Sequence, residues 1–206
     1  MVDNIWADNG LGGPLHSEEH YDGRKMLCFS ERPATLGAMF DDLMRRFSER
    51  PAFVEDCSIS YVQLDRLVGR IGAGLTELGV ISGDRVALFL GNCWEFLASV
   101  LACNRIGAII VPIGTRQRQA ELTFLLADRG AKVLIFESEL AGAVPPRKEL
   151  PDLAHLFSVR GAASGARPFS DLLATTRDAP RAAAVGEEDI AVILHTSGTT
   201  GRPKGV

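Results

Sequence analysis

The stretch RVALFL, residues 85–90, is a run of apolar residues with the length of a β-strand. Asn92 is predicted to cap the helical pattern that follows and continues to Ile106, and residues 108–111 form a second apolar run. Neither run alternates apolar with polar residues, as a strand with one solvent-exposed face would. The stretch therefore predicts a strand–helix–strand unit in a parallel sheet that is buried on both faces.

The same alternation continues after this unit. Residues 119–128 have a helical pattern, and residues 132–136 and 190–194 form further apolar runs that we expect to be buried strands. Between them, the sequence predicts a strand near residues 155–159 and a short helix near residues 169–173. Because parallel strands are joined by right-handed crossovers, the predicted fold class is α/β, a doubly wound and largely parallel sheet with helices on both faces.

Two helices before residue 85 have clear start signals. Thr35 precedes an amphipathic pattern, and Ser60 with Gln63 has the spacing of a capping box. Residues 1–34 show no clear period. We therefore predict a loose N-terminal arm over residues 1–34 and a domain over residues 35–206.

Composition excludes several classes of function. The net charge of −4 argues against a broad nucleic-acid-binding face, which would need an excess of Lys and Arg. The most apolar stretch, residues 86–111, is interrupted by polar and charged side chains, so no membrane span is predicted. The 4 cysteines show no C-x-x-C spacing and no neighbouring histidine cluster, so we expect free thiols, no metal ligands and a cytoplasmic location.

The chain then reads LHTSGTTGRPKGV at residues 194–206. Its glycines let the backbone expose N–H groups to an anion, its hydroxyls add neutral donors, and its lysine adds a positive charge. Neither G-x-x-x-x-G-K-[ST] nor G-x-G-x-x-G fits this segment. The alternative is a surface turn rich in Ser, Thr and Gly, which would explain the glycines but not four hydroxyls and a lysine next to a predicted buried strand. The candidate phosphate-binding residues are Thr196, Ser197, Gly198, Thr199, Thr200, Gly201 and Lys204.

The segment TSGTTGRPKG, residues 196–205, resembles the AMP-binding signature of the adenylate-forming superfamily, which includes acyl-CoA synthetases, peptide-synthetase adenylation domains and luciferases. The segments LGV at residues 78–80 and GDRV at residues 83–86 resemble a turn of the same family. The resemblance extends over roughly residues 35–206.

This resemblance implies two-step chemistry on a carboxylic acid such as a fatty acid. The carboxylate attacks the α-phosphorus of ATP, supplied as Mg-ATP, and the thiol of CoA then displaces AMP. The loop would hold the β- and γ-phosphates. In this family the catalytic lysine lies downstream of Lys204, so no catalytic residue is expected within these 206 residues. Arg202 receives no role, and His195 is expected to be a packing residue.

We therefore expect an N-terminal fragment of an acyl-CoA synthetase-like ligase that is inactive alone, with a separate chain as one source of the remaining part. The alternative is a non-catalytic module that binds a nucleotide or a partner, or a remnant without function. A P-loop phosphotransferase is disfavoured because the G-K-[ST] sequence is absent.

Overall fold

The computed structural model describes residues 13–55, 57–177, 183–196 and 204–205. Its elements, in chain order, are β1 (Leu15–His20), β2 (Arg24–Phe29), α1 (Leu36–Phe47), β3 (Pro51–Val54), β4 (Ser58–Ser60), α2 (Tyr61–Glu77), β5 (Arg85–Phe89), α3 (Trp94–Ile106), β6 (Ile109–Pro112), α4 (Gln119–Arg129), β7 (Ala131–Glu137), η1 (Ser138–Ala143), η2 (Arg147–Glu149), β8 (His155–Val159), β9 (Arg167–Pro168), α5 (Ser170–Leu173), β10 (His195–Thr196) and β11 (Lys204–Gly205).

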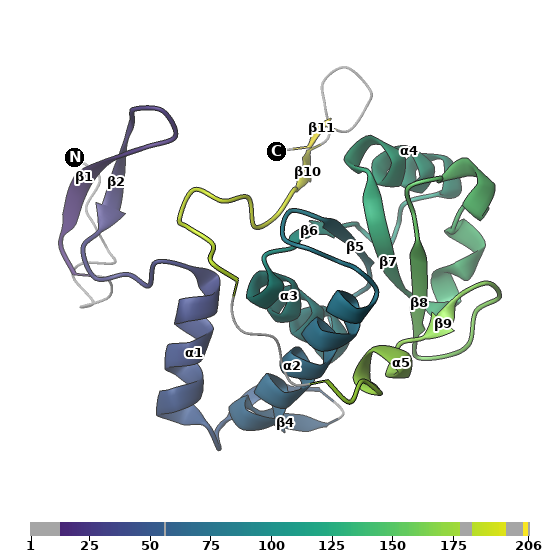
Figure 1. Ribbon diagram of the computed structural model, residues 1–206, viewed down its shortest axis with the longest axis horizontal. Helices are drawn as coiled ribbons and strands as arrows, with labels where there is room; N and C mark the ends of the chain where they lie inside the picture. The colour runs from purple at the N-terminus through teal and green to yellow at the C-terminus, as the bar shows by residue number, and fades with distance from the viewer. Residues whose placement is uncertain (1–12, 56, 178–182, 197–203, 206) are drawn as a thin grey trace.

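A five-stranded sheet in the order β6-β5-β7-β8-β9 is the centre of the fold (Figure 1). Every neighbouring pair in this sheet is parallel. The order runs outward from β5 in both directions, which is the doubly wound arrangement that the alternation of helices and apolar runs predicts. The predicted α/β fold class is therefore confirmed.

Side chains of the central strands point alternately into two hydrophobic cores. Val86 and Leu88 of β5 pack in the core that α2 and α3 cover. Ala87 and Phe89 pack in the opposite core with residues of α4. Since β5 is buried on both faces, its sequence has no polar alternation.

Most helix ends lie where the sequence signals place them. The Thr35 hydroxyl accepts a hydrogen bond from the Ala38 N–H at 3.1 Å, and both hydrogen bonds of the Ser60–Gln63 capping box are present. The prediction for Asn92 is wrong by one residue, because α3 begins at Trp94 and Cys93 is its N-cap. The Gly91 N–H donates to a Glu137 carboxylate oxygen at 2.8 Å, and the chain turns into the helix after this anchored glycine.

The prediction that residues 190–194 form a buried strand is also wrong, because part of this segment is exposed. This segment runs beside β6 with a parallel bridge between Val192 and Ile110, but Ile190 and Leu194 are 62% and 52% exposed. Ile193, on the other face, packs in the α4 core. The segment lies outside β6 at the edge of the sheet, so within the described residues only one of its faces is covered.

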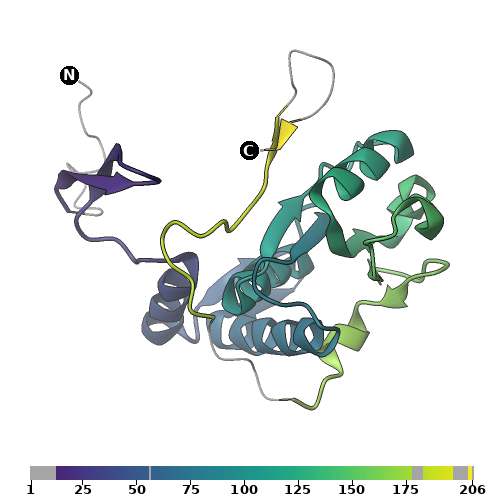
Figure 2. The same ribbon diagram turned by 45° about the horizontal axis from the view of Figure 1, so that its top comes forward.

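Within the predicted N-terminal arm, residues 15–29 contain two strands. β1 and β2 form an antiparallel hairpin that stands apart from the main sheet in both views (Figure 1, Figure 2). Tyr21, Asp22 and Gly23 all have positive φ and make the turn between the strands. The domain boundary at residues 34 and 35 itself stays a prediction.

Charged side chains tie together the loops at the amino-terminal edge of the sheet. Lys132 donates to the Gly79 carbonyl oxygen at 2.6 Å and pairs with the Asp84 carboxylate at 2.7 Å. Arg85 donates to the carbonyl oxygens of Arg129 and Gly130 at 2.7 and 2.8 Å. Side chains therefore hold the connections before β5 and β7 to each other, in addition to the backbone hydrogen bonds between these two strands.

We expect Asp84→Asn to lower the free energy of unfolding at pH 7 by about 1–2 kcal/mol, because it removes a charge-assisted hydrogen bond. Burial favours a higher pKa for Asp84, but the bonds from Lys132 and the Ile81 N–H outweigh it and lower the pKa below 3.8. The contribution is therefore present above pH 3.8 and is lost as pH falls through the folded-state pKa.

Urea unfolding at pH 7 and pH 3 measures both effects. The exposed Asp152→Asn is the matched control, since no described residue is hydrogen-bonded to its side chain. Equal unfolding free energies for wild type and Asp84→Asn at pH 7 would contradict the role given to the Lys132 pair.

The packing of α5 against α2 depends on Gly74. A Cβ atom at this position would lie 2.6 Å from the Leu172 carbonyl oxygen. We therefore expect Gly74→Ala to destabilise the protein by about 1–3 kcal/mol, despite the better helix propensity of alanine. Gly37→Ala in α1 is the control, because its added Cβ would meet only the Thr35 hydroxyl, at 3.7 Å. Thermal unfolding followed by circular dichroism compares them, and a Gly74→Ala protein as stable as wild type would refute the close packing.

Candidate functional site

The carboxyl-terminal edge of the sheet is where open α/β folds bind ligands. The strand order reverses between β5 and β7, so their carboxyl ends define the switch point of this sheet. A carboxylate oxygen of Glu137, at the end of β7, accepts the Gly91 N–H after β5, and a Cβ at Gly91 would lie 3.2 Å from that oxygen. A carboxylate therefore lies at the switch point and holds the turn after β5.

A charged cluster that the sequence analysis missed lies near the same edge. Arg160 follows β8, and its guanidinium lies 3.0 Å from a Glu55 carboxylate oxygen and 4.0 Å from one of the buried Glu95. Burial raises the pKa of the neighbouring Cys93 thiol to about 11, so this thiol is protonated and a poor nucleophile at neutral pH. Only spatial proximity joins these residues, and no sequence motif marked them.

The segment before the predicted phosphate loop is fastened to β6 by two backbone hydrogen bonds. The Ile110 N–H donates to the Ala191 carbonyl oxygen at 3.0 Å, and the Ile193 N–H donates to the Ile110 carbonyl oxygen at 2.9 Å. Because the two segments are parallel, the chain reaches His195 and Thr196 beyond the carboxyl end of β6. The loop thus begins at the ligand-binding edge of the sheet.

The two ends of the loop are paired with each other. β10 and β11 are antiparallel, with His195 opposite Gly205 and Thr196 opposite Lys204. Paired residues of this kind have Cα atoms about 4.5–5.5 Å apart, so the first and last candidate residues start from neighbouring backbone positions. Ser197, Gly198, Thr199, Thr200 and Gly201 lie outside the described residues.

His195 stands immediately before the loop. Partial burial lowers the pKa of its imidazole, and the charge of Arg129 lowers it further. The ring is therefore neutral at pH 7, and it adds no positive charge to the phosphate-binding candidates.

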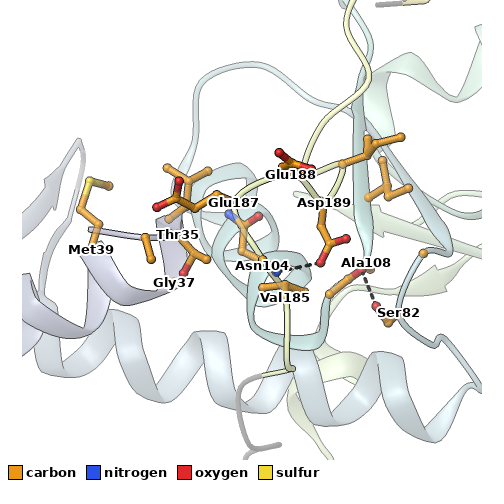
Figure 3. Close-up of a pocket in the computed structure, with 18 of the residues that line it drawn as sticks. Thr35, Gly37, Met39, Ser82, Asn104, Ala108, Val185, Glu187, Glu188 and Asp189 are labelled. Atoms are coloured by element: carbon orange, nitrogen blue, oxygen red, sulfur yellow. Dashed lines mark hydrogen bonds between the residues drawn. The ribbon is translucent and has the colours of Figure 1, made fainter. Parts of the chain in front are cut away.

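A cavity of about 560 Å³ lies away from the loop. It is beside the amino end of β6, between α1 and the segment 185–191, where the Gly186 N–H donates to Asp189 at 2.8 Å (Figure 3). Glu187, Glu188 and Asp189 give this cavity a negatively charged wall. Such a wall repels polyphosphate, so the cavity is not the candidate nucleotide site.

The described residues include no helix that is both long enough and apolar enough to cross a membrane.

Two kinds of sequence comparison agree with this arrangement. A family model described as AMP-binding enzyme matches residues 40–206. The long-chain-fatty-acid–CoA ligase FadD13 of Mycobacterium tuberculosis is 37% identical over 158 residues, which cover 75% of this chain and 31% of the ligase. A feruloyl-CoA synthase of Amycolatopsis sp is 36% identical over 150 residues, which cover 72% of this chain and 28% of the synthase. The chain thus spans about a third of the length of these relatives.

Solved structures share the fold. The anthranilate CoA ligase AuaEII in complex with anthranoyl-AMP superposes with a TM-score of 0.79 at 28% identity, covering 86% of this chain and 35% of the ligase. The N-terminal domain of FACL13 from Mycobacterium tuberculosis has a TM-score of 0.70 at 31% identity, covering 82% of this chain and 43% of that domain. From the matched residues, the fold and these relatives together, the chain belongs to the AMP-binding enzyme family.

Proposed function

We propose that residues 1–206 are the N-terminal part of a carboxylate–CoA ligase that activates its acid as an acyl-adenylate. In this proposal, the N-terminal part binds the phosphates of ATP. Thr196, Ser197, Gly198, Thr199, Thr200, Gly201 and Lys204 would bind the phosphates of ATP. The observation that carries the proposal is the pairing of Thr196 with Lys204 beyond the carboxyl end of β6, at the two ends of a glycine- and hydroxyl-rich loop.

The residue types fit a polyphosphate. Hydroxyls and glycine N–H groups offer uncharged donors, and Lys204 offers one positive charge, which together suit an anion rather than a metal ion. Holding the β- and γ-phosphates orients pyrophosphate as the leaving group while the carboxylate attacks the α-phosphorus. Positioning and charge neutralisation are most of what such a transfer requires from a protein. Mg-ATP, CoA and a carboxylic acid are the proposed substrates of the whole ligase.

Residues 1–206 alone would bind nucleotide phosphates without completing the reaction, because they match only about a third of each relative. No catalytic residue is assigned among them, and the remaining elements would come from further sequence or from a separate chain. We also propose a cytoplasmic location, where ATP and CoA are available and where the four unpaired cysteines stay reduced.

We expect no carboxylate-dependent ATP–pyrophosphate exchange from a purified protein of residues 1–206. The assay uses radiolabelled pyrophosphate with a panel of aliphatic and aromatic acids, and the exchange of a full-length CoA ligase serves as the positive control. Exchange above the protein-free background would show that the 206 residues suffice for adenylate formation.

We expect the same protein to bind ATP weakly and Lys204→Ala to weaken this binding by about five- to tenfold, because it removes one charge-assisted contact of about 1–1.4 kcal/mol. Lys148→Ala, in η2, is the matched control, since it removes the same charge from an exposed residue. Isothermal titration calorimetry with ATP and with pyrophosphate compares the variants. Equal affinities for the two alanine variants would contradict the phosphate role of Lys204.

A further inference from the structure

The hairpin places four potential metal ligands on one face. His16, Glu18 and His20 alternate along β1, so their side chains share a face of the ribbon. The register pairs His16 with Cys28 of β2, which brings a thiol to the same face. The sequence HSEEH at residues 16–20 shows His16, Glu18 and His20 at every second position. The nearby Cys28 thiol becomes apparent only from the register of β1 and β2.

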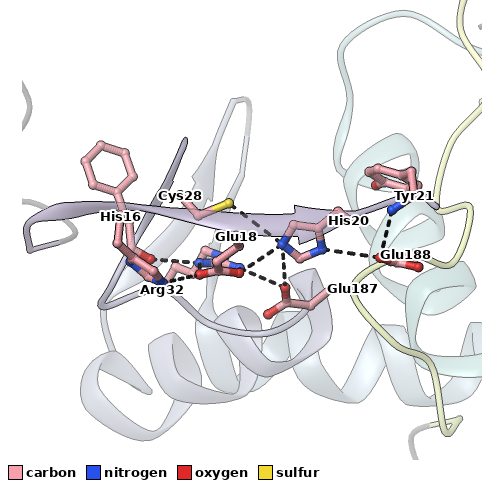
Figure 4. Close-up of polar contacts among 9 residues, drawn as sticks. His16, Glu18, His20, Tyr21, Cys28, Arg32, Glu187 and Glu188 are labelled. Atoms are coloured by element: carbon pink, nitrogen blue, oxygen red, sulfur yellow. Dashed lines mark hydrogen bonds and ion pairs between the residues drawn. The ribbon is translucent and has the colours of Figure 1, made fainter. Parts of the chain in front are cut away.

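His20 is the centre of this group (Figure 4). Its Nε2 atom lies 2.9 Å from a Glu18 carboxylate oxygen, 3.8 Å from the Cys28 sulfur and 4.0 Å from a Glu187 carboxylate oxygen. Zinc bonds of about 2.0–2.3 Å in a tetrahedral site put neighbouring ligand atoms roughly 3.4–3.6 Å apart. The ligand atoms of Glu18, His20 and Cys28 all lie within 4.8 Å of one another, so small side-chain rotations would enclose an ion.

The charges around His20 favour a divalent cation. Glu18, Glu187 and Glu188 contribute three carboxylates, and Arg32 contributes one guanidinium that contacts Glu18 and Glu187. The three carboxylates and the one guanidinium together contribute a net charge of −2. Each Glu18 carboxylate oxygen already contacts Arg32 and one histidine, so an ion bound to Glu18 and His20 would replace the direct contact between these two side chains. His16, with its Nε2 atom 2.5 Å from Glu18, would orient that ligand.

The hairpin also needs an attachment that its apolar residues do not provide. Leu27 is 73% exposed, and Leu15, Tyr21 and Met26 are exposed as well. An isolated two-stranded ribbon is marginally stable in water, and small units with little core are commonly held by a metal ion or a disulfide. Polar contacts to Glu187 and Glu188 join the hairpin to the segment 183–196: His20 contacts both carboxylates, and the Tyr21 N–H donates to Glu188 at 2.9 Å.

We propose that His20 Nε2, the Cys28 sulfur and the Glu18 carboxylate bind one zinc-class transition-metal ion, with Glu187 as the fourth ligand. A nitrogen and sulfur donor set favours zinc, cobalt or copper over magnesium and calcium. Binding releases the Cys28 proton to solvent, since the thiolate is the ligand. The ion fastens the N-terminal hairpin to the segment that leads into the phosphate loop, and this role is independent of the proposed ligase activity.

Titration of the tag-free 206-residue chain with Co²⁺ tests the site directly. We expect one equivalent to give a thiolate-to-cobalt charge-transfer band that Zn²⁺ abolishes. Cys28→Ser is expected to remove the band and to weaken Zn²⁺ binding by at least about 100-fold, and His20→Gln to weaken it similarly. Cys57→Ser is the control, because Cys57 is an exposed cysteine outside the cluster, and it should behave like wild type. A missing band means a hydrogen-bonded cluster without a metal, and an unchanged band in Cys28→Ser means that another cysteine binds the ion. Either result overturns the proposal.

Glu187→Gln tests whether the ion joins the two segments. Limited proteolysis within residues 13–29 should slow on adding Zn²⁺ to wild type, and this protection should be lost in Cys28→Ser and reduced in Glu187→Gln. Circular dichroism of each variant checks that the α/β sheet, which contains none of these residues, still folds. Full zinc protection in Glu187→Gln would refute the attachment to the segment 183–196.

Discussion

Burial of β5 and β7 on both faces is the constraint from which the rest of this structure follows. A parallel pair of this kind is stable only when both of its faces are covered, and here α2 and α3 pack on one face while α4 packs on the other. Phe89 and Phe136 fill one core, while Leu88 and Ile135 fill the other. With the central strands fixed, the direction of every neighbouring strand is fixed too, and all the loops that follow strands come to one edge.

That arrangement decides where the signature loop lies. The segment 190–194 adds to the sheet beside β6 through two backbone hydrogen bonds, and it therefore delivers Thr196 to the ligand-binding edge. Backbone hydrogen bonds to β6 therefore position the start of the loop. The side chains of the loop are not needed for this positioning. A large acidic cavity lies at the other end of β6.

The sequence predicted the sheet well because its strands are apolar runs and the helices before β6 and β7 end at glycines. Gly107 and Gly130 both take the left-handed conformation that ends a helix. The burial of residues 190–194 was predicted wrongly, since an apolar run does not show whether a second layer of described residues covers it. The hairpin was missed because the cross-strand pairing of His16 with Cys28 depends on a turn and a register, which spacing along the chain does not show. The assignment of the loop residues to ATP stays a prediction.

The ties at the amino edge have a consequence for how such a protein can change over evolution. Lys132, Asp84 and Arg85 hold the connections before β5 and β7 with side chains at the edge of the sheet opposite the predicted phosphate loop. The structural integrity of the sheet and the chemistry of its opposite edge are therefore encoded by different residues. Mutations can explore new side chains after the carboxyl ends of the strands without loosening the frame, so an architecture of this kind can acquire new specificities while it remains folded.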